Sequence, residues 1–393
     1  MNYNTALSKD IEIRHQRIQQ EMQYTGIDAC ILTTLPNVFY ATGGVYNGYF
    51  YLPAEGKPIH FLKRKSDFEL ENSVYIRKPE LIPAELEKSG YKLPQTVLLE
   101  VDAISFTDCN RLISSLQIKD IANASNLMRR LRSVKSEFEI SQIRECARQH
   151  EAVYKLIPEV YRKGMTDIEL QIEIERLMRL HGSMGLFRSY GANMDIYMGS
   201  LLVGENAESP SPFDFALGGK GQYPVLPIGA SGEKIKKGNT IMVDMAGNYR
   251  PWMTDMTRVF SAGKTLDLAY RAHQVSIDIN NHVMDIAKPG TQCAELYEIA
   301  MKKVEENHLE PYFMGTKQQA KFIGHGVGLE INEPPVLTPF SKEVLSTGTV
   351  FALEPKFVIP EVGAVGVENT YLITETGIEK LTLFEEEIIE LEA

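Results

Sequence analysis

The chain has 393 residues, 44% of them hydrophobic and 24% charged, which is long enough for two globular domains. Its formal net charge of −11 argues against nucleic-acid binding, which normally needs a basic surface. No signal peptide and no apolar run of about 18 residues is present. Four scattered cysteines without a CxxC pair indicate reduced thiols. We therefore expect a cytoplasmic protein that neither spans a membrane nor binds nucleic acid.

The N-terminal part of the chain alternates between helical and strand-like patterns. An amphipathic helix is predicted over Ile11–Tyr24, followed by a buried strand over Asp28–Thr33. Further strand-like runs cover Pro58–Lys63 and Thr96–Glu100. This alternation predicts a small α/β domain over residues 1–128.

The remainder of the chain has a different pattern. The charged stretch Arg129–Glu139 is typical of a linker that runs into a solvated helix. Helical patterns then cover Glu137–His181, Leu266–Ala287 and Ala294–Asn307, with short apolar strands over 182–263 and from Gly348 onward. Helices followed by strands, twice over, predict an α+β domain of two similar halves over residues 135–393.

Four acidic residues interrupt apolar strands in this second part of the chain. They are Asp244 in TIMVDMAG, Asp255 in MTDMTRVF, Glu354 in VFALEPKFVI and Glu368 in AVGVENTYLI. Burying an unpaired carboxylate costs several kcal/mol, so each needs a partner of opposite charge. A single one can lie at an exposed edge or pair with a nearby arginine. Since the neighbours are mostly apolar, bound cations explain all four together.

The spacing of these groups supports a shared site. The sequence GNYRP separates Asp244 from Asp255, which predicts a hairpin with both carboxylates on one face. His325 lies between glycines in FIGHGVGLE, where the backbone can approach a ligand closely. Four carboxylates would neutralise two divalent ions, and one imidazole among oxygen ligands favours Mn²⁺, Fe²⁺, Co²⁺ or Zn²⁺ over Ca²⁺.

These five residues resemble the ligand set of the pita-bread metallopeptidases, which include prolidase, aminopeptidase P and methionine aminopeptidase, with creatinase as a metal-free relative. The intervals are most similar to the prolidase and aminopeptidase P branch. Three segments resemble sequence motifs of that family: GHGVGLEINEPP, LEPKFVI and VGVENTYLITETGIEKLT. A fourth, LRSVKSEFEISQIRECA, resembles the segment at the start of its catalytic domain. LPNVFYATGG resembles part of the creatinase-type N-terminal domain.

The resemblance implies a pita-bread domain over residues 135–393, preceded by a smaller creatinase-like α/β domain over 1–128. It implies two divalent ions, with Mn²⁺ preferred and Co²⁺, Zn²⁺ or Fe²⁺ as alternatives, held by Asp244, Asp255, His325, Glu354 and Glu368. Glu354 would also act as general base. Two cations about 3.5–4 Å apart activate water and polarise the carbonyl under attack. Relatives of this branch are commonly dimers, so we expect a homodimer.

Three positions depart from the family pattern. Relatives usually carry histidines at the positions of Pro227 and Asn332, and an arginine at the position of Gly366. In the family these groups hold the substrate and stabilise the transition state. Asn332 can still donate a hydrogen bond, so it is a candidate for both catalysis and substrate binding, but it cannot shuttle a proton.

Other side chains could compensate for these losses. Lys356 replaces a small residue two positions after Glu354, and it could bind a substrate carboxylate or offset local negative charge. The segment Ser200–Pro227, rich in Gly and Pro, could bring further groups to the site. The remaining candidates, each more often a surface charge or a packed aromatic, are Asp214, Lys220, Tyr223, Arg188, Tyr190 and Trp252.

Three functions fit these observations. The first is an Xaa-Pro dipeptidase or aminopeptidase with a rebuilt substrate pocket, acting on small peptides. The second is a metal-dependent hydrolase or lyase of a small non-peptide compound. The third is a catalytically silent protein that keeps its metals for structure. Retention of all five ligands speaks against the third, and the three departures speak against an unmodified form of the first.

Overall fold

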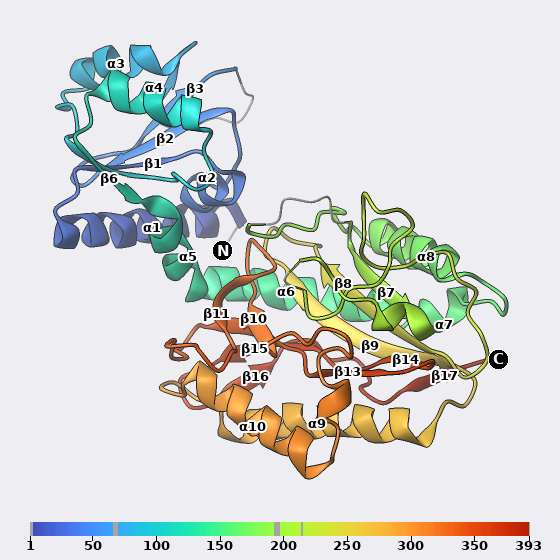
Figure 1. Ribbon diagram of the computed structural model, residues 1–393. Helices are drawn as coiled ribbons and strands as arrows, with labels where there is room; N and C mark the ends of the chain where they lie inside the picture. The colour runs from blue at the N-terminus through green and yellow to red at the C-terminus, as the bar shows by residue number, and fades with distance from the viewer. Residues whose placement is uncertain (1–2, 66–69, 192–196, 214, 393) are drawn as a thin grey trace. The chain divides into compact units, whose positions relative to one another are not determined.

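The structure is a computed structural model that describes residues 3–65, 70–191, 197–213 and 215–392 (Figure 1). Contacts between residues divide the chain into two compact units, Met1–Arg132 and Ser133–Ala393. Each unit has its own sheets and its own apolar core. The four cysteine thiols are free, as the sequence predicts.

Unit 1 is built on a six-stranded mixed sheet with strand order β4-β3-β2-β1-β5-β6. The strands are β1 (Ala29–Leu32), β2 (Gly48–Pro53), β3 (Ile59–Leu62), β4 (Ser73–Tyr75), β5 (Thr96–Leu99) and β6 (Asp120–Asn123). The helices are α1 (Tyr3–Thr25), α2 (Leu35–Thr42), η1 (Pro79–Leu81), α3 (Ile82–Lys88), α4 (Phe106–Leu116) and α5 (Ala124–Ser133). The predicted α/β character, first helix and three strands are confirmed.

The predicted linker over Arg129–Glu139 is wrong in its details. Its first residues complete α5, which ends at Ser133, and α6 (Glu137–Tyr154) begins directly after Ser136. Ser136 accepts a hydrogen bond from the Glu139 amide, and the Glu139 carboxylate accepts one from the Ser136 amide. This capping box starts α6 and keeps Glu139 buried, so its charge does not mark a solvated face.

Unit 2 contains the remaining strands in sheets ordered β17-β9-β8-β7, β11-β10-β12-β15-β16 and β13-β14. The strands are β7 (Gly199–Val203), β8 (Thr240–Gly247), β9 (Thr254–Ala262), β10 (Gly324–Gly326), β11 (Glu333–Val336), β12 (Val350–Leu353), β13 (Lys356–Ile359), β14 (Gly363–Gly366), β15 (Asn369–Ile373), β16 (Ile378–Lys380) and β17 (Ile389–Leu391). The helices are α6, α7 (Ile157–Val160), α8 (Asp167–Leu180), η2 (Gly204–Glu208), α9 (Asp267–Ile286), α10 (Cys293–Glu306) and η3 (Glu310–Tyr312). The predicted order of helices then strands, twice over, is confirmed.

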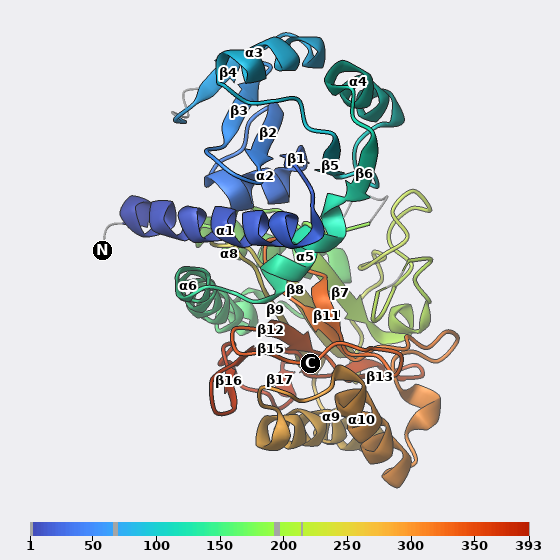
Figure 2. The same cartoon turned by 90° about the vertical axis from the view of Figure 1, so that its left-hand side faces the viewer.

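Helices cover the strands of unit 2 by their apolar faces. Helix α9 packs on β13 and β14, and α10 lies beside α9 (Figure 2). The buried positions Ala269, Ala272, Val275, Ile279 and Val283 recur every three or four residues, which places them on one face of α9. Helix α6 packs on β8 and β9, and α8 packs on β7 (Figure 1). The strands between these helices, and the short breaks that separate some of them, carry the acidic residues.

The helices that the structure describes include none with both the length and the apolar character that a membrane crossing requires.

Candidate metal centre

The hairpin of β8 and β9 carries the two aspartates. In its antiparallel register Asp244 lies opposite Thr257, and Asp255 lies opposite Ala246. Since alternate residues of a strand face the same side, Asp244 and Ala246 share a face, and Asp255 joins them from the neighbouring strand. The predicted hairpin with both carboxylates on one face is confirmed.

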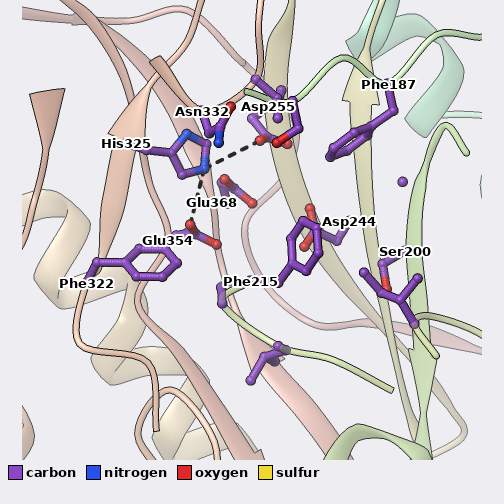
Figure 3. A pocket seen from close by; sticks show the side chains of 16 residues that line it. Phe187, Ser200, Phe215, Asp244, Asp255, Phe322, His325, Asn332, Glu354 and Glu368 are labelled. Atoms are coloured by element: carbon purple, nitrogen blue, oxygen red, sulfur yellow. Dashed lines mark ion pairs between the residues drawn. The ribbon is translucent and has the colours of Figure 1, made fainter. Parts of the chain in front are cut away.

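The two glutamates lie where paired strands are interrupted. Glu354 separates β12 from β13, and Glu368 separates β14 from β15. Because β12 pairs with β15 and β13 with β14, both interruptions fall at the same level of the sheet. A bridge between Glu368 and Thr257 joins this level to β9. Both glutamate side chains therefore point toward the aspartates (Figure 3).

His325 approaches the same carboxylates from β10. Its Nε2 lies 3.3 Å from Glu354 Oε1 and 3.8 Å from Asp255 Oδ2 (Figure 3). The flanking glycines are required by close backbone packing: a Cβ at Gly324 would lie 2.1 Å from the Ala352 carbonyl oxygen. A Cβ at Gly326 would similarly lie 2.0 Å from the Pro334 carbonyl oxygen. The five residues that the sequence singles out thus converge on one site.

Lys356 also enters this site, from the first position of β13. Its Nζ donates hydrogen bonds to Asp244 Oδ2 at 2.8 Å, Glu354 Oε2 at 2.7 Å and Glu368 Oε2 at 3.0 Å. The side chain is 0% exposed. Of the two roles that the sequence left open, these contacts support the offset of local negative charge.

Burial and charge act against each other in the pKa values of this cluster. Burial would lower the pKa of Lys356, but Asp244, Glu354 and Glu368 raise it well above its ordinary value. Burial would raise the pKa of Glu354, yet Lys356 and His325 bring it to about 2. Glu368 is different, because burial together with Glu354 and Asp244 outweighs Lys356 and raises its pKa to about 8. Burial and the other carboxylates likewise raise the pKa of Asp255.

A bound cation would offset the negative charge of the carboxylates that Lys356 does not neutralise. Asp255, His325 and Glu368 each offer a ligand atom, and these atoms lie within 4.8 Å of one another. Among the described residues, Glu368 Oε1 is buried and has no hydrogen-bond partner. A buried, unpaired carboxylate oxygen beside an imidazole and a second carboxylate fits a divalent transition-metal ion.

Comparison with known families gives the same reading. The sequence profile of metallopeptidase family M24 matches residues 141–375, and that of the creatinase/prolidase N-terminal domain matches residues 14–134. The chain belongs to metallopeptidase family M24. It is a hydrolase of the peptidase type, and the family implies divalent metal ions.

Among M24 relatives, the chain is 27% identical to an Xaa-Pro dipeptidase of Pyrococcus horikoshii over 383 residues, covering 95% of this chain and 98% of that protein. The solved prolidase structure of P. horikoshii has a TM-score of 0.77 at 23% identity, covering 95% of this chain and 99% of that one. An Xaa-Pro dipeptidase structure from Bacillus anthracis has a TM-score of 0.79 at 21% identity, covering 98% and 100%. The pita-bread fold with a preceding α/β domain is therefore shared with these proteins.

The four clustered carboxylates and His325 line a cavity whose wall is partly polar and partly apolar (Figure 3). Besides the four carboxylates and His325, the wall of this cavity contains Ser189, Ser200, Asn332 and several apolar side chains. The larger apolar ones are Phe187, Phe215, Leu217, Ile228, Phe322 and Ile331. No lysine or arginine occurs in the wall as far as residues are described.

Asn332 lines this cavity, and its amide is engaged with a neighbouring segment. The Tyr190 amide donates to Asn332 Oδ1 at 2.7 Å, and Asn332 Nδ2 donates to the Tyr190 carbonyl at 3.0 Å. These reciprocal bonds fix the chain next to Phe187 and Ser189, which also line the cavity. Sequence reasoning named Tyr190 and Asn332 separately but did not predict this pairing.

The other described residues that the sequence offered as replacements for the missing substrate-binding groups are not among the residues that line this cavity. Lys220 pairs with Glu233 at 3.0 Å on the surface, and the Tyr223 side chain is 70% exposed. Trp252 is buried and donates to Glu139 Oε1 at 3.0 Å. The main-chain carbonyl of Arg188 accepts a hydrogen bond from Ile331. Asp214 lies outside the described residues.

Sequence reasoning missed the groups that orient the carboxylates. Thr257 Oγ1 donates to Glu368 Oε2 at 2.7 Å, and Thr370 Oγ1 accepts from the Asp255 amide at 2.8 Å. Arg258, fully buried, donates to the Glu368 carbonyl at 2.8 Å. Thr257 could have been predicted from the sequence, because it lies two residues after Asp255 and therefore shares its face of β9. The phenylalanines of the cavity come from separate loops, and no sequence pattern predicts that they lie together.

Proposed function

We propose that this chain is a metal-dependent peptidase that cleaves Xaa-Pro bonds in small peptides. The observation that carries the proposal is the cluster of Asp255, His325 and Glu368 in the wall of a cavity that also contains phenylalanine side chains. Two relatives that bear the name Xaa-Pro dipeptidase match 95% and 96% of this chain, which supports the substrate class. Three of the sequence-predicted ligands, Asp255, His325 and Glu368, enter this proposal together with the general-base assignment of Glu354. Asp244 and Glu354 would be further ligands if a second cation binds.

The cavity wall supports an apolar group next to the metal ligands. Phe187, Phe215 and Phe322 offer ring faces against which a pyrrolidine ring can pack. Their burial of the substrate excludes water from the reacting bond, which strengthens electrostatic interactions there. The described residues of this wall include no lysine or arginine that could pair with a peptide carboxylate.

The chain's own residues have distinct tasks in this proposal. A divalent cation bound by Asp255, His325 and Glu368 supplies Lewis-acid activation of water and of the scissile carbonyl. Glu354, whose pKa is held to about 2 by Lys356 and His325 against its burial, is ionised at neutral pH and accepts a proton from the attacking water. Asn332 holds the main chain of Tyr190 at the cavity wall through both the oxygen and the nitrogen of its amide.

The identity and the number of the metal ions are part of this proposal. Imidazole with carboxylate ligands favours Mn²⁺, with Co²⁺, Zn²⁺ or Fe²⁺ as alternatives. Two cations, as the sequence predicts, would require Lys356 to leave the carboxylates that it now contacts. The homodimer and the cytoplasmic location stay predictions. Light scattering on the purified chain tests the first, and fractionation of the source cells tests the second.

The test is hydrolysis of a panel of Xaa-Pro dipeptides and tripeptides by chelator-treated protein reloaded with Mn²⁺ or Co²⁺. Matched Xaa-Ala peptides control for proline specificity. We expect cleavage of the Xaa-Pro members only, abolished by chelator and restored by metal. Glu354→Gln should retain metal and lose at least about a hundredfold in turnover, the usual range for a general base.

Two results would contradict the proposal. Equal cleavage of Xaa-Ala and Xaa-Pro peptides would remove the proline specificity. A protein that binds metal yet cleaves no peptide would favour a small non-peptide substrate, or a metal site without catalysis. Screening the same loaded protein on amide, ester and carbon–heteroatom substrates separates these two.

A further inference from the structure

The two glutamates of the cluster use their two oxygens for different partners. Glu354 Oε2 accepts from Lys356 Nζ at 2.7 Å, while its Oε1 lies 3.3 Å from His325 Nε2. Glu368 Oε2 accepts from Lys356 at 3.0 Å, and its Oε1 is the buried oxygen without a partner among the described residues. Each glutamate therefore links the ammonium on one side to the His325 side on the other.

The aspartates divide in the same way. Asp244 Oδ2 accepts from Lys356 Nζ at 2.8 Å, and Asp244 is not in the compact group of potential ligands. Asp255 belongs to that group, with its Oδ2 3.8 Å from His325 Nε2. The cluster thus consists of an ammonium subsite with Asp244 and a cation subsite with Asp255 and His325, and the glutamates are shared by both.

The ammonium subsite is complete as it stands. An ammonium group has three donors, and three carboxylate oxygens at 2.7–3.0 Å take all of them. The positive centre lies where three carboxylates converge, which is the geometry that a cation would need. A divalent ion cannot share this position with the ammonium, because the two would repel each other at contact distance.

The main chain holds Lys356 in this place. The Met314 amide donates to the Lys356 carbonyl at 2.8 Å, and the Lys356 amide contacts Met314 Sδ at 3.3 Å. On the opposite strand, a Cβ at Gly366 would lie 3.0 Å from Lys356 Cα. The backbone of Lys356 is thus fixed on both sides, and its side chain is fully buried.

Charge counting agrees with this division. Once a metal ion has displaced the protons of Asp255 and Glu368, the four carboxylates carry four negative charges, of which the ammonium offsets one and a divalent ion offsets two. One ion leaves a single negative charge next to the Thr257 hydroxyl, which donates to Glu368 Oε2, whereas two ions with the ammonium would leave a buried excess of positive charge.

We propose that the Lys356 ammonium takes the place of one of the two cations, so that the site binds a single divalent ion between Asp255, His325 and Glu368, adjacent to Glu354. The inference rests on the proposed metal-dependent function only in requiring that this subsite binds a cation. Lys356 is then a built-in, non-exchangeable positive charge, and Asp244 is its partner rather than a metal ligand.

Metal stoichiometry of the full chain tests the proposal without any activity measurement. Chelator-treated protein is titrated with Mn²⁺ by calorimetry, and bound metal is counted by mass spectrometry after desalting. We expect one ion per chain, with the electron paramagnetic resonance spectrum of an isolated Mn²⁺. Asp244→Asn should still bind one ion, whereas Glu368→Gln should bind none.

Substitution of the lysine provides a matched pair. Lys356→Ala removes both the charge and the volume, and we expect it to bind two Mn²⁺ ions with an exchange-coupled spectrum. Lys356→Met removes the charge but keeps most of the volume, and should still bind one. Adding Asp244→Asn to Lys356→Ala should return the count to one.

Several outcomes would overturn the proposal. Two ions with a coupled spectrum in the unaltered protein would show that Lys356 leaves the carboxylates, and that result does not depend on whether any variant folds. A folded Lys356→Ala protein that binds only one ion would show that the lysine does not determine the number. Absence of any bound ion in the unaltered protein would overturn the metal-dependent function as well.

Discussion

Lys356 and Gly366 lie directly opposite each other in the β13–β14 ladder. Gly366 has φ +131°, and a Cβ there would lie 2.6 Å from the Pro355 carbonyl oxygen and 3.0 Å from Lys356 Cα. The position at which relatives usually carry an arginine is therefore closed to a side chain in this protein. The positive charge of this strand pair comes from Lys356 instead, and it points into the carboxylate cluster.

Gly366→Ala should destabilise the protein by about 2 kcal/mol or more, because it adds a Cβ to a left-handed backbone conformation in contact with backbone. Chemical denaturation monitored by circular dichroism measures the change. Gly377→Ala is the control, since nothing lies within 4 Å of a Cβ at that position. Equal midpoints for the two variants would show that the strand pair relaxes around the added atom.

Lys356→Met should lower the free energy of unfolding of the metal-free protein by about 3–5 kcal/mol, the usual effect of removing one partner from a buried charge cluster. The surface pair of Lys220 and Glu233, with side chains 51% and 41% exposed, provides the comparison. Lys220→Met should change stability by no more than about 1 kcal/mol. Similar values for both lysines in urea titrations would contradict the charge balance described here.

Metal removal should lower the thermal unfolding midpoint. A ligand that binds only the folded state adds roughly 2.7 kcal/mol of stability at a free concentration one hundred times its dissociation constant. Scanning calorimetry with Mn²⁺ and with chelator should therefore differ by several degrees. Asp255→Asn loses a ligand of the cation subsite and should show the same midpoint in both conditions; a retained difference would place the metal elsewhere.

Asn332→Ala should raise KM by roughly tenfold with a smaller change in kcat, because both hydrogen bonds to the Tyr190 main chain disappear and the cavity wall is no longer fixed. Steady-state kinetics on a cleaved Xaa-Pro peptide gives both constants. Asn332→Asp keeps the acceptor for the Tyr190 amide and should fall between the two proteins. A fall in kcat at unchanged KM would instead indicate that Asn332 acts on the transition state.

Stability should decrease as the pH falls from 6.5 to about 4, partly through His273. Burial, with a contribution from Arg258, lowers the pKa of His273 to about 4. Its Nε2 lies 2.6 Å from the Glu386 carbonyl, and the Gly366 amide donates to its Nδ1 at 3.1 Å. Below the pKa that His273 has in the unfolded chain, the unfolded chain binds a proton on this histidine that the folded chain does not. Unfolding is therefore favoured by up to ~3 kcal/mol, an effect that is absent above pH 7.

Denaturation curves between pH 7 and 4.5 test the histidine. His273→Gln should flatten the pH dependence of the unfolding free energy, whereas His181→Gln, at an exposed position, should leave it unchanged. An unaltered slope in the first variant would assign the acid sensitivity to other buried groups.

The local pattern of the sequence was enough for much of the fold and for naming the five residues that converge on one site. The 3.6-residue spacing of apolar positions defines α9, and the turn GNYRP fixes the hairpin of Asp244 and Asp255. Acidic residues in otherwise apolar strands reveal the site, because buried charge without compensation is too costly to persist. Each of these signals is contained within a few neighbouring residues.

Only the tertiary structure decided how the charges at the site are arranged. The sequence places Lys356 two residues after Glu354 and leaves open whether its ammonium faces a substrate or the carboxylates. The answer depends on Asp244 and Glu368, which come from β8 and from the break between β14 and β15. The pairing of Asn332 with Tyr190 is also between segments distant in sequence. Electrostatic and hydrogen-bond energies depend on distances in space, and these are set by packing of the whole domain rather than by any local pattern.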